Sequence, residues 1–196
     1  MTDTATKKLD RREAVKFLLE DRGDMLLVSS LGGPSYDLTA ATGEHALDYC
    51  LGGAMGGCTM FGFGLSIAQP SRRVISFCGD GEMLMSLGSL AAIGAEKPKN
   101  FGIVVIDNEF YAETGMQKTH TGRGVDLVGV AKACGFDAHQ VRNQDELVDA
   151  RKALRNADGP CFVSLKVENN IPPLFSRIRD GVWNKGKFRM ALLGHV

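Results

Sequence analysis

Short β-branched runs alternate along the chain with segments whose apolar residues recur every three or four positions. The first pattern is typical of buried strands and the second of helices with one buried face. Strands are expected at Met25–Ser29, Val74–Cys78, Ile103–Asp107 and Cys161–Val167. Helices are expected at Arg11–Glu20, Met55–Ala68, Met83–Ala95, Leu127–Cys134 and Gln144–Asn156, the last with Asn143 as its N-cap. The alternation predicts an α/β fold with a mainly parallel central sheet in three α/β/α layers.

The length and composition indicate one folded domain over residues 1–196. Of the 196 residues, 44% are apolar and 23% are charged, which excludes disordered and collagen-like chains. The 23 basic and 23 acidic side chains cancel, so the charge does not favour nucleic acid or an anionic membrane as a partner. Residues 171–196 open with Ile171-Pro172-Pro173 and then turn basic and aromatic. We expect this tail to pack on the domain or on a partner.

Three features bear on where the protein works. The five cysteines include no C-x-x-C pair, and they are expected to be buried thiols in a reducing compartment. A reactive thiol or a disulfide is the alternative. The polar N-terminus lacks the apolar core of a secretory signal. Residues 49–71 carry no charge, but their glycines and Pro70 favour a buried helix over a transmembrane one. A cytoplasmic protein is therefore expected.

The most distinctive polar motif is Gly79-Asp80-Gly81-Glu82, where a predicted strand ends and a helix begins. Glycines let the backbone approach a ligand closely, and the first amides of a helix attract phosphate. The motif completes neither the dinucleotide fingerprint nor the P-loop. A carboxylate facing a diphosphate is repelled unless a cation such as Mg²⁺ lies between them. The alternative is a simple glycine turn with a capping aspartate.

A second polar pair, Asp107-Asn108, follows the next predicted strand along the chain. The carboxyl ends of neighbouring parallel strands lie side by side, so Asp80 and Asn108 could face one ion. Both side chains offer the hard oxygen ligands that Mg²⁺ prefers. The sequence thus predicts a Mg²⁺ site at this edge of the sheet.

The two motifs, with residues 82–106 between them, resemble the diphosphate-binding motif of thiamine-diphosphate enzymes. The resemblance implies the thiamine-diphosphate-binding fold, with thiamine diphosphate and Mg²⁺ as cofactors. It implies metal ligation by Asp80, by the Asn108 side chain and by the Phe110 carbonyl. Implied cofactor contacts are Gly79, Asp80, Gly81, Glu82, Asn108, Phe110, Tyr111 and Ala112, with the amides of Gly81 and Glu82 on the diphosphate. Two departures are Asp107, for the first asparagine of the usual pair, and Glu82, often a serine, which must point away from the diphosphate.

A further matching element is Leu51-Gly52-Gly53-Ala54-Met55-Gly56. In the family a bulky apolar residue at this place holds the cofactor bent between its two rings, and Met55 occupies it here. Gly53 and Ala54 are implied cofactor contacts beside Met55. Bending the cofactor in advance removes a conformational cost from the reaction. The alternative is that Met55 is a core side chain at the start of a helix.

Several longer segments resemble one subgroup, the β subunit of sulfopyruvate decarboxylase and the carboxy-terminal half of phosphonopyruvate decarboxylase. These segments are Glu13–Phe17, Ser30–Ser35, Gly88–Gly94, Glu113–Gln117 and Thr119–Thr121. Met116 is a departure, because that subgroup usually has a second glycine there. The resemblance implies a lyase that decarboxylates a 2-oxo acid such as sulfopyruvate or phosphonopyruvate to an aldehyde and CO₂.

The resemblance also implies a partner subunit. The family carries the glutamate that protonates the aminopyrimidine ring on a separate pyrimidine-binding domain, and 196 residues leave no room for it. The chain is therefore expected to be one part of a split enzyme, active only with an α-type, pyrimidine-binding subunit in a hetero-oligomer.

Other polar residues are weaker candidates. His120 could donate a proton or contact an anion, or it could be an ordinary surface histidine. The nearby cluster of Gln117, Lys118 and Arg123 could recognise an acidic substrate group or could simply be solvated. Glu109, Glu113 and His45 have the same ambiguity.

Two alternative functions remain at this stage. A carboligase of the acetolactate synthase type would keep the cofactor and change the acceptor. A non-catalytic assembly or regulatory subunit would keep the fold alone.

Overall fold

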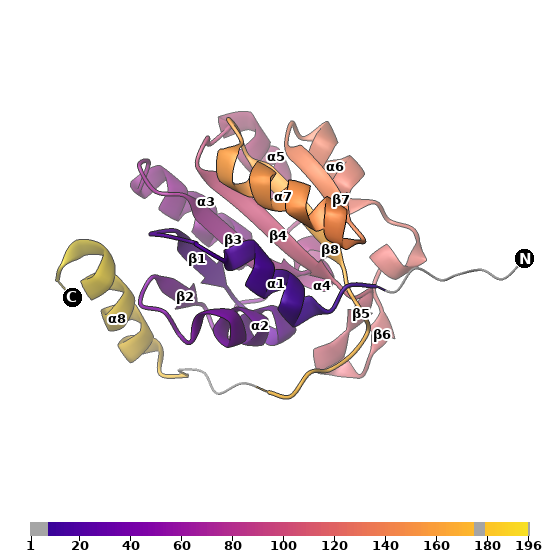
Figure 1. Ribbon diagram of the computed structural model, residues 1–196, viewed down its shortest axis with the longest axis horizontal. Coiled ribbons are helices and arrows are strands. Elements are labelled where there is room, and N and C mark those ends of the chain that lie inside the picture. Colours follow the sequence, from indigo (N-terminus) through magenta and orange to yellow (C-terminus); the bar gives the residue numbers. More distant parts are fainter. Residues whose placement is uncertain (1–7, 175–178, 196) are drawn as a thin grey trace, which may run out of the picture.

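A six-stranded parallel sheet forms the centre of the protein in the computed structural model, which describes residues 8–174 and 179–195 (Figure 1). The strand order is β2-β1-β3-β4-β8-β7, and every neighbouring pair is parallel. The strands are β1 (Leu26–Ser29), β2 (Asp48–Cys50), β3 (Val74–Gly79), β4 (Phe101–Asp107), β7 (Asp137–Val141) and β8 (Cys161–Lys166). The predicted α/β class is confirmed. Most of the polar N-terminus, and residues 175–178 and 196 of the expected tail, lie outside the described residues.

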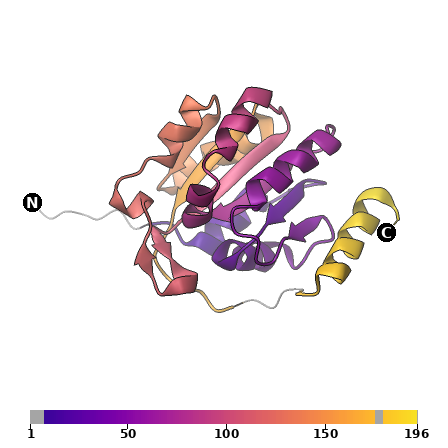
Figure 2. The same ribbon diagram turned by 180° about the vertical axis from the view of Figure 1, so that it is seen from behind.

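Helices cover both faces of the sheet and complete the three layers (Figures 1 and 2). One face packs against α1 (Arg11–Leu19), α2 (Gly32–Thr42) and α7 (Gln144–Asn156). The opposite face packs against α3 (Cys58–Ala68), α5 (Ser89–Glu96) and α6 (Leu127–Ala133). The short α4 (Asp80–Met85) follows β3 directly. The loop after β4 contains a small hairpin of β5 (Phe110–Tyr111) and β6 (Gln117–Lys118). It also contains two 3-10 turns, η1 (Ala112–Thr114) and η2 (Thr121–Arg123).

Strand β4 shows why β-branched runs become the centre of this fold. All of its residues from Phe101 to Asp107 are buried. Ile103 and Val105 belong to the core under α3, α5 and α6, whereas Val104 and Ile106 belong to the core under α1, α2 and α7. A strand covered on both faces needs an apolar residue at every position, so it shows no alternation with polar residues.

The register of the central strands places polar residues at one edge of the sheet. Gly79 of β3 pairs with Ile106 of β4. The next residues of these neighbouring strands, Asp80 and Asp107, therefore lie at the same edge of the sheet. Asp107 in turn pairs with Lys166 of β8. The carboxyl ends of β3, β4 and β8 therefore meet, as the sequence predicted for the first two.

Two predicted helices differ from the structure. The helix expected at Met55–Ala68 begins only at Cys58, because Gly56 adopts a left-handed conformation with φ 84°. The helix expected at Met83–Ala95 is two helices, α4 and α5, separated at residues 86–88. The predicted N-cap is confirmed, since the Asn143 side chain accepts a hydrogen bond from the Glu146 amide at 3.0 Å.

Among the described residues, the predictions also lack the small hairpin with its two 3-10 turns and, of the larger elements, α2, β2, β7 and the last helix, α8 (Gly181–Leu193). Strands β2 and β7 lie at the two edges of the sheet, where polar residues interrupt the apolar runs. Helix α8 packs beside β2, where the ring of Phe188 lies 5.3 Å from that of Tyr49. The Asn184 side chain also donates to the Cys50 carbonyl at 2.9 Å.

All five cysteines lie among the described residues, and none of them forms a disulfide. Cys58, Cys78 and Cys161 are buried as expected, but Cys50 and Cys134 are only half-buried. Burial raises the pKa of each of the three buried thiols, which keeps them protonated and unreactive. Within the described residues, every helix is too short or too polar to cross a membrane.

Candidate active site at the carboxyl edge of the sheet

Asp80 is the buried acidic group on which the candidate site is built. Gly79 ends β3 in an extended conformation, and Asp80 then begins α4, so the carboxylate lies at the junction of strand and helix. Asp80 is only 2% exposed to solvent. The hydroxyls of Thr119 and Thr121 both donate toward the same oxygen, Oδ2.

The pKa of Asp80 is raised to about 6, first by burial and then by the neighbouring carboxylate of Asp107, whereas the threonine hydrogen bonds act in the opposite direction. Ionised Asp80 is thus costly in the empty protein. A divalent cation would remove this cost by neutralising the Asp80 carboxylate.

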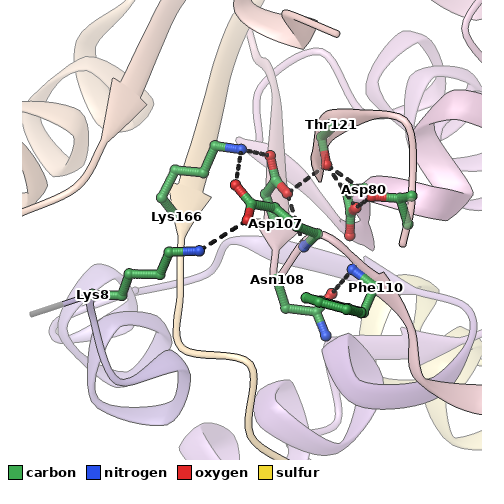
Figure 3. Close-up of polar contacts among 9 residues, drawn as sticks. Lys8, Asp80, Asp107, Asn108, Phe110, Thr121 and Lys166 are labelled. Carbon is green, nitrogen blue, oxygen red and sulfur yellow. Dashed lines mark hydrogen bonds and ion pairs between the residues drawn. The ribbon is translucent and has the colours of Figure 1, made fainter. Parts of the chain in front are cut away.

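The polar pair after β4 is close to this carboxylate (Figure 3). Asp107 is buried, and its Oδ1 lies 2.9 Å from the Thr121 hydroxyl that also contacts Asp80. Asn108 is buried too, and its Oδ1 accepts a hydrogen bond from the Phe110 amide at 3.2 Å. The tight turn requires a left-handed conformation at Glu109, with φ 69°.

One cavity of about 140 Å³ brings most of the predicted residues together. Among the predicted residues its lining includes Met55, Gly79, Asp80, Gly81, Glu82, Asn108, Phe110, Tyr111, Ala112 and Glu113. Gly53 and Ala54 are not among the lining residues and are exposed. Gly81 has a steric role, since a Cβ there would lie 2.3 Å from the Tyr111 ring.

The side chain of Glu82 turns back toward the segment before α3. Its Oε1 accepts hydrogen bonds from the Gly56 amide at 3.2 Å and from the Ser30 hydroxyl. Burial raises the pKa of Glu82, and these hydrogen bonds oppose that effect. Glu82 therefore ties the segment carrying Met55 to the end of β1.

The start of α2 forms a further wall of the cavity. The sequence patterns did not predict this helix. Gly32, Gly33 and Pro34 line it. The first amides of an 11-residue helix carry partial positive charge suited to an anion. Arg11 lines the same cavity and is the one cationic side chain among the described residues that do so. Its Nε donates to Asp37 at 2.6 Å.

Two threonines that carry the site were visible only as part of a longer resemblance. The hairpin of β5 and β6 pairs Phe110 with Lys118, and the next residue, Thr119, then donates its amide to the Glu109 carbonyl at 2.9 Å. Thr119 and Thr121 are thus turned inward. His120 between them is exposed and does not line the cavity.

Most of the other weak candidates also lie outside the cavity. Gln117, Lys118 and Arg123 are exposed. His45 precedes β2, at the opposite end of that strand from the site, and its Nδ1 accepts from the Leu47 amide at 3.1 Å. Glu113 is exposed but does reach the cavity, beside Gly32.

Lys166 is the main polar residue that the sequence patterns missed. It ends β8, and its Nζ lies 2.7 Å from Oδ2 of Asp107 and 3.0 Å from Oε1 of Glu109 (Figure 3). Lys8 pairs with the other oxygen of Glu109 at 3.0 Å. Burial alone would lower the pKa of Lys166, but the hydrogen bond and charge of Asp107 raise it. The available signal was its place at the carboxyl end of a predicted strand.

The fold and this site together define the class of protein. Residues 34–165 match the family described as "Thiamine pyrophosphate enzyme, C-terminal TPP binding domain", and the chain belongs to that family. Among solved structures, the benzoylformate decarboxylase of Polynucleobacter necessarius has a TM-score of 0.68 at 18% identity, over 86% of this chain and 36% of that one. A 4-hydroxybenzoylformate decarboxylase of Rhodococcus jostii has a TM-score of 0.69 at 18% identity, over 87% of this chain and 34% of that one. These structures share the fold, and the chain spans about a third of each.

Curated relatives are more specific. The chain is 37% identical over 168 residues to "Sulfopyruvate decarboxylase subunit beta" of Methanococcus maripaludis, which covers 84% of this chain and 89% of the relative. It is 38% identical over 153 residues to "Phosphonopyruvate decarboxylase" of Streptomyces viridochromogenes, which covers 78% of this chain and 38% of the relative. The predicted resemblance is confirmed, including the match to only part of the longer enzyme.

Proposed function

We propose that this chain is the diphosphate-binding subunit of a split, thiamine-diphosphate- and Mg²⁺-dependent 2-oxo acid decarboxylase. The observation that carries the proposal is the buried carboxylate of Asp80, which faces the cavity beside a second buried carboxylate, Asp107. A buried carboxylate that faces a cavity favours a bound cation. The names of the relatives favour a decarboxylase over the carboligase and over a non-catalytic subunit.

The residues present fit the metal. Asp80, the side-chain oxygen of Asn108 and the carbonyl of Phe110 supply the hard oxygen donors that Mg²⁺ requires, and all three residues line one cavity. Oδ2 of Asp80 accepts both threonine hydrogen bonds, so Oδ1 is the oxygen left for the ion. The amides of Gly81 and Glu82 and the start of α2 offer donors to a diphosphate, beside the guanidinium of Arg11.

Thiamine diphosphate, when bound, supplies a carbon nucleophile and an electron sink for decarboxylation. Within this chain, Met55 would support the bent cofactor, and Glu82 would keep the Met55 segment in place through the Gly56 amide. The apolar walls formed by Leu31, Ile106 and Phe110 would exclude water. This chain would thus position the cofactor and shield it from water.

A partner subunit would complete the site. Relatives of this chain are named as β subunits, which implies a second subunit. We propose that it is a pyrimidine-binding, α-type subunit carrying the catalytic glutamate, and that the two form a hetero-oligomer. His120 and the basic residues near it are exposed, so they would reach the substrate only from the surface that faces this partner.

The described fold and the contact of α8 with β2 are consistent with one domain over residues 1–196.

The substrate is proposed to be a pyruvate that carries a sulfonate or phosphonate on its third carbon. The relatives named above act on substrates of these names. Five cysteines without a disulfide suit a reducing, cytoplasmic location.

The test begins with the complex purified from its native host. We expect stoichiometric thiamine diphosphate and Mg²⁺, a bound partner subunit, and CO₂ release from sulfopyruvate or phosphonopyruvate. Asp80→Ala should lose the metal, the cofactor and the activity, whereas the exposed Asp158→Ala should keep all three. Product analysis with an added aldehyde acceptor separates decarboxylation from carboligation. An active Asp80→Ala complex would overturn the proposal.

A further inference from the structure

Lys166 occupies a place that no function above requires. It is the last residue of β8 and pairs in register with Asp107, the last residue of β4. Its side chain is only 13% exposed, and its Nζ lies 2.7 Å from Oδ2 of Asp107. A largely buried ammonium is costly unless it is paired, so the contact with Asp107 offsets the desolvation of Lys166.

The other oxygen of Asp107 points toward the candidate metal ligand. Oδ1 lies 2.9 Å from the hydroxyl of Thr121, and this hydroxyl lies 2.9 Å from Oδ2 of Asp80. A continuous path of direct contacts therefore runs from Lys166 through Asp107 and Thr121 to Asp80 (Figure 3). Lys166 does not line the cavity, and along this path it acts there through Asp107.

We infer that Lys166 is a positioning residue for the metal site: it neutralises Asp107 and orients it, so that Asp80 is held ready for the cation and the diphosphate. This inference rests on the proposed function. Two adjacent buried carboxylates repel one another, and both would otherwise compete for the ion or turn away from each other. With Lys166 bound to Oδ2, Asp107 is left with Oδ1 for Thr121, and Asp80 remains the carboxylate at the cavity.

The chain offers a matched control in Lys8. Its Nζ pairs with Oε2 of Glu109 at 3.0 Å, and Lys166 pairs with Oε1 of the same residue at 3.0 Å. Both lysines therefore belong to one ionic network and carry the same charge. Lys8 is 42% exposed at its side chain and pairs with Glu109, whereas Lys166 pairs with Asp107, so Lys8 tests whether a nearby positive charge alone suffices.

The experiment measures how much Mg²⁺ the purified complex needs for half-maximal binding of thiamine diphosphate, followed by protein fluorescence without any substrate. Lys166→Met should raise this Mg²⁺ concentration by about 10- to 100-fold, as removal of a supporting group of a metal ligand commonly does. Lys166→Arg should keep most of the affinity. Lys8→Met should change it by less than about 2-fold, since exposed pairs contribute little.

A double variant separates positioning from general support of the fold. In an Asp107→Asn background the neutral amide needs no cation, so adding Lys166→Met should cost less than about 3-fold there, because the two residues act as a coupled pair. If Lys166→Met does not fold, Lys166→Gln takes its place, since it keeps a donor for Asp107 and lacks the charge.

The inference is overturned if Lys166→Met binds Mg²⁺ as well as the parent, or if it weakens binding equally in the Asp107 and Asn backgrounds. A parent complex that binds no thiamine diphosphate at any Mg²⁺ concentration instead contradicts the proposed function, and this result is seen before any variant is made.

Discussion

The hydroxyl of Thr121 lies 2.9 Å from Oδ2 of Asp80, although 41 positions separate the two residues in the chain. The same oxygen of Thr121 lies 2.9 Å from Oδ1 of Asp107. A hydroxyl has one proton to donate, so it can satisfy only one of the two carboxylates at a time. Thr121 is therefore the hydroxyl that connects the two carboxylates.

Thr121→Val should weaken Mg²⁺-dependent binding of thiamine diphosphate by roughly 10-fold, because the valine keeps the volume and removes the hydrogen bond that orients Asp80. Thr121→Ser retains the hydroxyl and should stay close to the parent. A Mg²⁺ titration of cofactor binding checks both. Equal affinities for the valine and serine variants would contradict the role given to the hydroxyl.

Asp80→Asn should change stability in opposite directions with and without metal. The folded-state pKa of Asp80 is raised from 3.8 to about 6. The folded protein therefore binds more protons than the unfolded chain between about pH 4 and 6, and stability falls as pH rises through that range. The loss attributable to Asp80 is about 3 kcal/mol at most.

Urea unfolding in EDTA at pH 4 and pH 7 measures this effect. The free energy of unfolding of the parent should fall with pH more steeply than that of Asp80→Asn, so that the variant gains relative to the parent at pH 7. With saturating Mg²⁺ and thiamine diphosphate the order should reverse, since only the parent binds the metal. If the free energies of unfolding of the parent and of Asp80→Asn had the same pH dependence in EDTA, the pKa of Asp80 would not be raised in the folded protein.

Glu82→Ala should destabilise the protein by about 1–3 kcal/mol, because the amide of Gly56 and the hydroxyl of Ser30 lose their buried acceptor. Glu82→Gln keeps an oxygen acceptor and should cost less than about 1 kcal/mol. Urea unfolding gives the free energies, and hydrogen exchange at residues 53–57 reports the predicted loosening of the Met55 segment. Unchanged exchange there in Glu82→Ala would separate Glu82 from that segment.

Met116 adopts a left-handed conformation with φ 63°, directly after Gly115 with φ 113°. Glycine tolerates this conformation, whereas a side chain strains it. Met116→Gly should therefore keep stability or raise it by up to about 1 kcal/mol. Met116→Val should lower stability by at least as much, since a β-branched residue is least suited to positive φ. Thermal unfolding of the three proteins is the measurement, and a more stable valine variant would contradict the assigned strain.

The sequence by itself determined those features that depend on neighbours along the chain. The apolar runs of β3 and β4 are buried on both faces, so they are recognisable without any partner strand. The two polar motifs after these strands identified Asp80 and Asn108, because parallel strands must end at a common edge. Helix α2 escaped detection because its first residues, Gly32-Gly33-Pro34, are typical of a loop and no side chain caps it.

Only the tertiary structure decided which distant side chains meet at that edge. Thr121 lies in a loop that returns to Asp80 at the end of β3. Lys166 ends β8, which lies between β4 and β7 in the sheet and so brings the lysine beside β4. Contacts of this kind depend on strand order and register, which local residue patterns do not encode. The sequence therefore determined the carboxylate at the cavity, and the fold determined the hydroxyl and the ammonium that surround it.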